Sequence, residues 1–386
     1  MSKKHSKSNA DEAPQELIAS PVATPEISGS ELTGLATSVP KLGVPELLEG
    51  TVTRGYGDRL EVDVNGETLL CPIRGKLKHG RRQMSQPVNV GDRVRVRPLD
   101  NFGPNTRGER LREGYIEEVL PRRSQLGRAR YRKVAQVSVA NLDQVVVVMA
   151  ARDPDINPHR LDRFLVLAEV AELAPIVCIN KRDLVKKTAF NRDIKPILKL
   201  YEKIGYQTVA VSAETDEGIP ELRAILKDHI SAFVGSSGVG KSSVINAVQP
   251  GLRLYIGDVM EIGKGRHTTT EVSLHRLKGG GYLADTPGIK TVSLLDDDIH
   301  LDECFPEFRE VARTCRFNDC SHLEEPGCQV RAGVEAGKIA ASRYDSYKRI
   351  FEETAQTQRA SNKQILEGRS ARKESPKIQI KKPPSD

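Results

Sequence analysis

The residues best suited to chemistry form a glycine-rich string in the middle of the chain. Its spacing, G-x4-G-K-S, follows an apolar run and precedes a helical pattern, as in a phosphate-binding loop. Lys241 is the predicted catalytic amine, reaching the β and γ phosphates, and the Ser242 hydroxyl is a predicted Mg²⁺ ligand. A purely structural glycine-rich turn is the alternative. The predicted contacts are Gly235, Ser236, Ser237, Gly238, Val239, Gly240, Lys241, Ser242 and Ser243.

Two strings farther along the chain supply candidate metal and switch residues. Asp285 begins an Asp-Thr-Pro-Gly string that ends at Gly288, directly after a short apolar run. A carboxylate there can hold Mg²⁺ through water, and the glycine amide can contact the γ phosphate. Between this string and the phosphate loop lie three consecutive threonines, of which Thr269 is the predicted Mg²⁺ ligand. Taken alone, Asp-Thr-Pro-Gly is equally consistent with an ordinary turn.

Base recognition is predicted from polar residues at two other strand ends. A carboxylate can accept hydrogen bonds from N1–H and the exocyclic amine of guanine, whereas adenine presents the opposite pattern. Either string alone is weak evidence, and the first is equally consistent with a salt-bridged loop. Together with the phosphate loop, they predict binding of GTP and GDP. The residues are Asn180, Lys181, Arg182 and Asp183 in the first string, and Ser212 and Ala213 in the second.

Three of the six cysteines gather near one histidine in the last quarter of the chain. The set offers three thiolates and one imidazole, which is the ligand complement of a closed, tetrahedral structural zinc site. Reduced cysteines on a loop are the alternative. The predicted zinc ligands are Cys315, Cys320, His322 and Cys328.

Alternating apolar strands and amphipathic helices after about residue 140 predict an α/β domain with a parallel sheet to position these loops. The expected strands are Gln144–Ala150, Pro175–Asn180, Gln207–Ala213, His229–Gly235 and Gly281–Asp285. The expected helices are His159–Leu173, Phe190–Gly205, Ile219–Lys227 and Gly240–Val248, with a further helical stretch at Gly333–Ala360.

Shorter, alternating strands precede this domain and predict a small β-barrel of the OB-fold type. The expected strands are Thr51–Thr53, Arg59–Val64, Thr68–Pro72, Arg93–Arg97 and Tyr115–Val119. The predicted organisation is a disordered arm at 1–44, the OB-fold barrel at 45–124, the α/β domain at 125–297, a zinc-binding helical domain at 298–360 and a basic flexible tail at 361–386.

The positive charge is uneven along the 386 residues. The chain carries a net charge of +7, yet residues 51–135 alone hold 19 Lys and Arg against 10 Asp and Glu. A solvated face explains one such cluster, but several clusters in one segment favour a polyanion such as RNA. No run of apolar residues is long enough for a membrane span, and six cysteines make a poor disulfide framework. We expect a cytoplasmic protein.

The order of the motifs is unusual. In Ras-like GTPases the phosphate loop comes first and the base-reading loops come last, whereas here 180–183 and 212–213 precede 235–242. The sequence therefore predicts a circularly permuted P-loop GTPase. This order, the basic barrel, the string Arg266-His267-Thr268-Thr269-Thr270 and the Cys/His cluster resemble the ribosome small subunit-dependent GTPase A (RsgA/YjeQ) family across about residues 45–355. The family places glutamine where this chain has Ser236.

This resemblance implies a GTPase that binds the small (30S) ribosomal subunit and its 16S rRNA during late maturation and leaves after GTP hydrolysis. It also implies one structural Zn²⁺ beside Mg²⁺ and GTP, and we expect a monomer. The usual water-positioning glutamine is replaced by Ile289. His267 is the predicted catalytic substitute, which the resemblance also indicates, and an ordinary exposed loop histidine is the alternative. The competing functions are an RNA-binding chaperone tuned by guanine nucleotide and a signalling GTPase with protein effectors.

Overall fold

The computed structural model describes residues 47–56, 59–72, 88–128, 136–252, 272–285 and 300–356, with only the backbone at 125–128 and 136–138. The predicted N-terminal arm and basic tail lie outside these ranges. Within them, no helix has the length and apolar character needed to cross a membrane.

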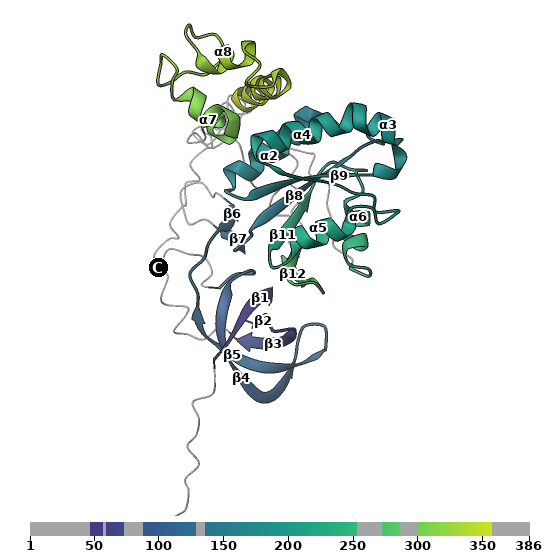
Figure 1. Cartoon of the computed structure of the whole chain (residues 1–386). Helices are drawn as coiled ribbons and strands as arrows, with labels where there is room; N and C mark the ends of the chain where they lie inside the picture. Colours follow the sequence, from purple (N-terminus) through teal and green to yellow (C-terminus); the bar gives the residue numbers. More distant parts are fainter. Residues whose placement is uncertain are drawn as a thin grey trace, which may run out of the picture. The chain divides into compact units, whose positions relative to one another are not determined.

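Five strands near the N-terminus pair into a closed ring (Figure 1). Each strand pairs with two others in the order β1, β2, β3, β5, β4 and back to β1, and only the β3–β5 pairing is parallel. The prediction of five strands is confirmed, although β1, β4 and β5 are longer than expected. Their bounds are β1 (Leu48–Tyr56), β2 (Arg59–Val64), β3 (Glu67–Pro72), β4 (Arg93–Pro104) and β5 (Arg110–Val119).

A second strand system forms the predicted α/β sheet, in the order β10-β9-β8-β11-β13-β12. All neighbours are parallel except β12, which runs antiparallel to β13. The strands are β8 (Gln144–Ala150), β9 (Ala174–Asn180), β10 (Gln207–Ala210), β11 (Ile230–Val234), β12 (Ser273–Arg276) and β13 (Tyr282–Asp285). β12 was not expected from the sequence, and neither was the separate hairpin of β6 (Gln125–Arg128) and β7 (Gln136–Ala140).

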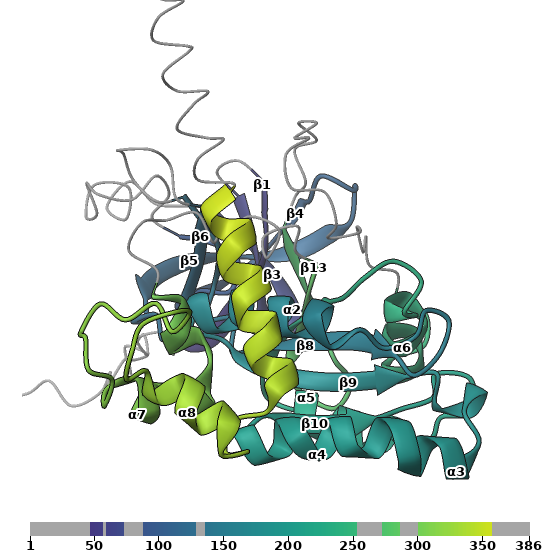
Figure 2. The same cartoon turned by 90° about the horizontal axis from the view of Figure 1, so that it is seen from above.

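Helices cover both faces of this sheet (Figure 2). On β8, Val145, Val147 and Met149 pack with α2 and α4, whereas Val146 and Val148 pack with α5 and α6. This alternation is the period-2 pattern of a strand buried on both faces. The helices are α2 (Pro158–Val170), α3 (Lys187–Ala189), η2 (Phe190–Ile194), α4 (Lys195–Ile204), α5 (Ile219–Leu226) and α6 (Lys241–Val248), with η1 (Arg182–Leu184) as a short turn.

A helix and a strand of the α/β domain also differ from the sequence prediction. The predicted single helix at Phe190–Gly205 is divided, because Pro196 has no N–H to donate and a π-helical turn precedes it. The predicted strand Gln207–Ala213 ends at Ala210, so that Ser212 and Ala213 lie in the loop that follows.

The C-terminal module comprises η4 (Leu301–Cys304), α7 (Pro306–Ala312), α8 (Gln329–Glu335) and a helix at 341–356. The predicted helical stretch at Gly333–Ala360 is interrupted at 336–340, where Gly337 has φ +69°. Phe305, Phe308 and Tyr347 form its aromatic core, with Phe305 and Phe308 stacked at a centroid distance of 5.0 Å.

A strand pairing and one ion pair with a buried carboxylate join the ring to the α/β sheet. β1 pairs with β12 at Arg54 and Ser273. The Asp63 carboxylate, which is almost fully buried, accepts hydrogen bonds from Arg276 at 3.0 and 3.1 Å and from the Tyr282 hydroxyl at 2.5 Å. A buried carboxylate without partners is costly. These contacts with Arg276 of β12 and Tyr282 of β13 therefore hold the ring against the α/β sheet.

Candidate functional site

The phosphate loop connects the central strand β11 to helix α6, as predicted. Gly235, Gly238 and Gly240 all have positive φ, at +148°, +79° and +86°. A Cβ on Gly240 would lie 2.4 Å from Asn180 Nδ2, and one on Gly235 would lie 2.2 Å from the Val148 carbonyl oxygen. Gly235 and Gly240 are therefore required both for backbone conformation and for space, and Gly238 for backbone conformation.

Lys241 folds back over this loop at the first turn of α6. Its side chain is only 6% exposed, and Nζ donates to the carbonyl oxygens of Gly235 at 3.0 Å and Ser236 at 2.8 Å. Ser237, Ser242 and Ser243 are exposed around it. A positive amine, exposed hydroxyls and the N-terminus of a helix suit a polyphosphate.

Asn180 joins the predicted base-reading loop to the phosphate loop. Its Nδ2 donates to the Val239 carbonyl oxygen at 3.0 Å, and its Oδ1 accepts from the Ala213 amide at 3.2 Å. The side chain is buried, so both hydrogen bonds are shielded from water. Three loops predicted separately from the sequence therefore meet at one amide.

Asp183, the predicted guanine-binding carboxylate, is exposed beside Ser212. The Ser212 hydroxyl donates to its Oδ1 at 2.6 Å, and Oγ of Ser212 also accepts from the Thr215 amide at 3.2 Å. This chain of hydrogen bonds fixes the orientation of the carboxylate at the loop surface, where a base can approach it.

The two residues between Asn180 and Asp183 make contacts within the protein. Lys181 adopts a left-handed conformation, and its amine donates to the carbonyl oxygen of Asp153 in the loop after β8. The Arg182 guanidinium lies 3.9 Å from the Phe190 ring centroid and donates to the Val185 carbonyl at 2.7 Å. In this structure Arg182 therefore stabilises the loop, and contact with a nucleotide remains a prediction.

Asp285 lies at the end of β13, which pairs in parallel with β11 through Ala232 and Ala284. This register brings Asp285 to the edge of the sheet where the phosphate loop begins. His267, Thr269 and Gly288 lie outside the described residues, so their predicted roles remain predictions.

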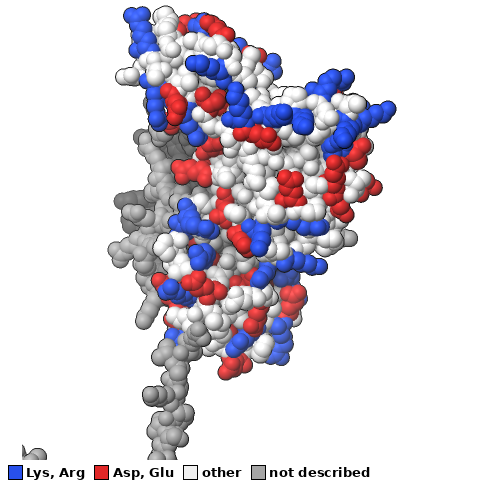
Figure 3. Space-filling model, in the orientation of Figure 1, with Lys and Arg blue, Asp and Glu red and all other residues white. Residues whose placement is uncertain are grey.

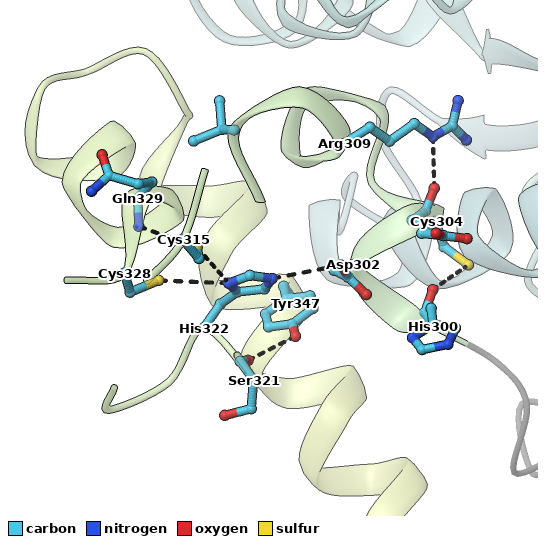
Figure 4. Close-up of polar contacts among 12 residues, drawn as sticks. His300, Asp302, Cys304, Arg309, Cys315, Ser321, His322, Cys328, Gln329 and Tyr347 are labelled. Atoms are coloured by element: carbon cyan, nitrogen blue, oxygen red, sulfur yellow. Dashed lines mark hydrogen bonds and ion pairs between the residues drawn. The ribbon is translucent and has the colours of Figure 1, made fainter. Parts of the chain in front are cut away.

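The four predicted zinc ligands come together, with their ligand atoms all within 4.8 Å of one another. His322 Nδ1 lies 3.6 Å from Sγ of both Cys315 and Cys328 (Figure 4). Ligand atoms around a tetrahedral zinc lie roughly 3.5–4 Å apart, so the donor set fits that ion. The imidazole is 2% exposed and is held among aromatic rings of the module.

Two carboxylates beside these ligands were not predicted from the sequence. Asp302 Oδ2 lies 3.6 Å from His322 Nε2, and the imidazole lowers the pKa of the Asp302 carboxyl. Glu325 accepts from the Ser321 amide at 2.8 Å, from the Ser321 hydroxyl at 2.5 Å and from the Leu323 amide at 3.1 Å. These hydrogen bonds, led by that from the Ser321 hydroxyl, lower the pKa of Glu325 to about 2. Each carboxylate orients the loop around His322.

The module is attached to the α/β domain through a buried arginine. Arg343 is 1% exposed and forms ion pairs with Asp162 of α2 and, at 2.7 Å, with Glu307 of α7. The Tyr201 hydroxyl donates to the same Asp162 carboxylate at 2.6 Å. Asp162 interrupts the apolar face of α2, and this interruption is a sequence signal that could have indicated a buried partner.

On the outer face of the ring, the arginines of β4 are neutralised by neighbouring strands. The alternating sequence at the start of β4 places valines inward and arginines outward. Each arginine, however, faces a glutamate, and arginine and acidic side chains are interspersed over this part of the surface (Figure 3). The pairs are Arg93–Glu49, Arg95–Glu118 and Arg97–Glu117, with N–O distances of 2.9, 2.9 and 3.1 Å.

Comparisons with known proteins find the family that the motif order had suggested. Residues 119–295 match the family model described as RsgA GTPase. The chain is 38% identical over 315 residues to the small ribosomal subunit biogenesis GTPase RsgA of Caldanaerobacter subterraneus, covering 81% of this chain and 98% of that one. The RsgA of Haemophilus influenzae is 37% identical, with 81% and 86% covered.

Two solved structures are also similar. The crystal structure of YjeQ from Thermotoga maritima aligns with a TM-score of 0.62 and 36% identity, covering 80% of this chain and 99% of that one. YloQ, described as a circularly permuted GTPase, aligns with a TM-score of 0.62 and 29% identity, covering 81% and 96%.

Proposed function

This chain belongs to the RsgA family of circularly permuted GTPases, and we propose that it hydrolyses GTP as an assembly factor of the small (30S) ribosomal subunit. The observation that carries the proposal is the joining of the phosphate loop to the guanine-reading loop through Asn180 and Val239. This contact links motifs in permuted order, and relatives that are 37–38% identical to this chain are named small ribosomal subunit biogenesis GTPases.

The nucleotide would bind at the edge of the sheet where the strands β11, β9 and β10 end. Backbone amides of 235–240 and the Lys241 amine would contact the phosphates, and Asp183 would accept the two guanine hydrogen bonds. Ser242, Thr269 and Asp285 would hold Mg²⁺, with Gly288 at the γ phosphate. When bound, Mg²⁺ neutralises charge on the β and γ phosphates.

Hydrolysis requires a residue to orient the attacking water, because Ile289 can neither donate nor accept a hydrogen bond. We assign this role to His267. A His267→Ala variant should retain GTP affinity and lose stimulated turnover. Full stimulated turnover in that variant would contradict the assignment.

RNA binding is proposed for the N-terminal ring. Its closed order of five strands, with β3 and β5 parallel, supports an OB-fold barrel. We propose 16S rRNA of the small subunit as its partner and a monomeric protein that acts in the cytosol. The proposed domain bounds are 45–124, 125–297 and 298–360.

The Cys/His cluster is proposed to hold one structural Zn²⁺. All four donors come from one short segment, and the buried His322 meets Asp302 on its other nitrogen. A closed set of three thiolates and one imidazole favours a structural over a catalytic ion.

The test is GTP turnover with and without purified small ribosomal subunits, at two salt concentrations. We expect slow intrinsic turnover, large stimulation by subunits and weaker stimulation at high salt, because counterion release drives phosphate contacts. Lys241→Met should abolish turnover, and Lys195→Met, at an exposed position of α4, should not.

Each other outcome argues for a competing function. Binding to subunits without stimulation would favour an RNA chaperone whose affinity is tuned by nucleotide. Turnover that is indifferent to subunits at both salt concentrations would contradict the assembly role.

A further inference from the structure

Phe102 has the largest exposed fraction among the large apolar side chains that the structure describes, at 54%. It lies in the outer part of the β4–β5 hairpin. β4 pairs with β1 only through Arg93–Val96, and β5 pairs with β3 only through Arg112 and Glu113. Phe102 therefore lies on a part of β4 that pairs with β5 on one side and with no described strand on the other.

Two arginines share its face of the hairpin. Phe102 lies directly opposite Arg112, and Pro104 lies directly opposite Arg110. Directly opposite residues, and residues two apart along a strand, project to the same side of an antiparallel pair. The face thus carries one aromatic ring and two guanidinium groups.

Within the described part of the chain, Arg110 is not neutralised by a glutamate, unlike the arginines of β4. Its Nη2 donates to the Phe102 carbonyl oxygen at 3.3 Å, and across the described ranges it makes no ion pair with a carboxylate. Arg112 is held by the Leu99 carbonyl at 2.7 Å and by the exposed Asp100 at 3.2 Å. A cation beside an exposed ring suits a nucleotide, whose base can stack while its phosphate is neutralised.

The turn of the hairpin is fixed to the ring. Asn105 Oδ1 accepts from the amides of Arg107 and Glu109, both at 2.9 Å. Its Nδ2 donates to the buried Glu61 of β2 at 3.0 Å. Because the hairpin is fixed, the Phe102 side chain loses little conformational entropy when a ligand stacks on it.

We propose that Phe102 is a stacking platform for an unpaired base of single-stranded RNA, with Arg110 neutralising the neighbouring phosphate. The inference rests on the proposed function and extends it from phosphate recognition to contact with one base. It assigns a binding role to a residue outside both the nucleotide site and the Cys/His cluster.

The first test compares full-length variants for binding to purified small ribosomal subunits. Base stacking on an aromatic side chain is worth about 1–3 kcal/mol, so Phe102→Ala should weaken binding about five- to 140-fold. Phe102→Leu should weaken it similarly, because it keeps apolar area and loses the aromatic face. Arg110→Ala should lower the slope of log affinity against log salt by about 0.7, the value for one phosphate of a single strand. Intrinsic GTP turnover should be unchanged in all three variants.

The chain contains no tryptophan, so Phe102→Trp creates a single fluorescent reporter at the platform. Stacking on a base should quench its emission when subunits are added. Phe317→Trp is the matched control, because Phe317 is 40% exposed, lies near Arg316 and belongs to the Cys/His module. Its emission should not be quenched to the same extent.

The outcomes separate this inference from the proposed function. If wild type fails to bind subunits, the proposed function itself is wrong. If wild type binds and Phe102→Ala binds equally, the stacking platform alone is refuted. Retained binding by Phe102→Leu, with a blue shift and no quenching in Phe102→Trp, would indicate a protein contact and would also overturn it.

Discussion

Replacing Arg343 by methionine should undock the Cys/His module from the α/β domain. The substitution keeps the apolar stem and leaves the carboxylates of Asp162 and Glu307 without a cation. Asp162 is fully buried, and the guanidinium also lies 4.5 Å from the Phe305 ring centroid. Removing one partner of a buried ion pair costs about 3–5 kcal/mol, which is roughly a hundred- to several-thousandfold in the docking equilibrium.

Hydrogen exchange of backbone amides measures this loss without requiring global unfolding. Amides of the helix at 341–356 should exchange faster in Arg343→Met, and those of β8 should be unchanged. Lys348→Ala is the control, since its 3.0 Å pair with Asp345 is exposed and worth at most ~0.5 kcal/mol. Arg343→Lys should be intermediate, because an ammonium cannot replace the two-pronged contact with Glu307. Protection in Arg343→Met no lower than in Lys348→Ala would refute this reasoning.

Two further substitutions test the nucleotide site and the metal site. Gly240→Ala should weaken binding of a fluorescent GDP analogue at least about tenfold, because its Cβ would meet Asn180 and the strain at positive φ adds to the clash. Gly251→Ala has nearly the same φ, +85°, with nothing within 4 Å, so it should bind normally; equal affinities would contradict the steric argument. Glu325→Gln should release zinc to a colorimetric chelator about 10–100-fold faster, because it weakens the acceptor for Ser321 and Leu323. The exposed neighbour variant Glu324→Gln should match wild type, and equal release rates for both variants would exclude a positioning role for Glu325.

The features that could be predicted from the sequence are those whose residues lie close together in the chain. The loop between β11 and α6 carries its own glycines, and β8 is a run of apolar residues bounded by polar ones, so the strand–loop–helix order and the strand β8 were both predicted correctly. The four ligands of the Cys/His cluster also lie within one short segment. In each case the residues that decide the structure are neighbours in the chain.

Contacts between distant segments could not be predicted in the same way. Asp162 and Arg343 are 181 positions apart and no spacing rule relates them. The alternation of valine and arginine in β4 determines which side chains face outward, yet it does not show that Glu49 and Glu118 would neutralise the arginines. Charge counted along the chain therefore overstated the basic surface that this part of the ring presents.

The central claim is that this protein is a GTP-hydrolysing assembly factor that binds the small ribosomal subunit with GTP and leaves it after hydrolysis. Cosedimentation of the full-length chain with purified subunits tests it most directly, with a non-hydrolysable GTP analogue in one sample and GDP in the other. The account predicts that the protein sediments with subunits in the GTP analogue and remains in the supernatant with GDP. Equal binding in both samples, or binding in neither, would contradict it.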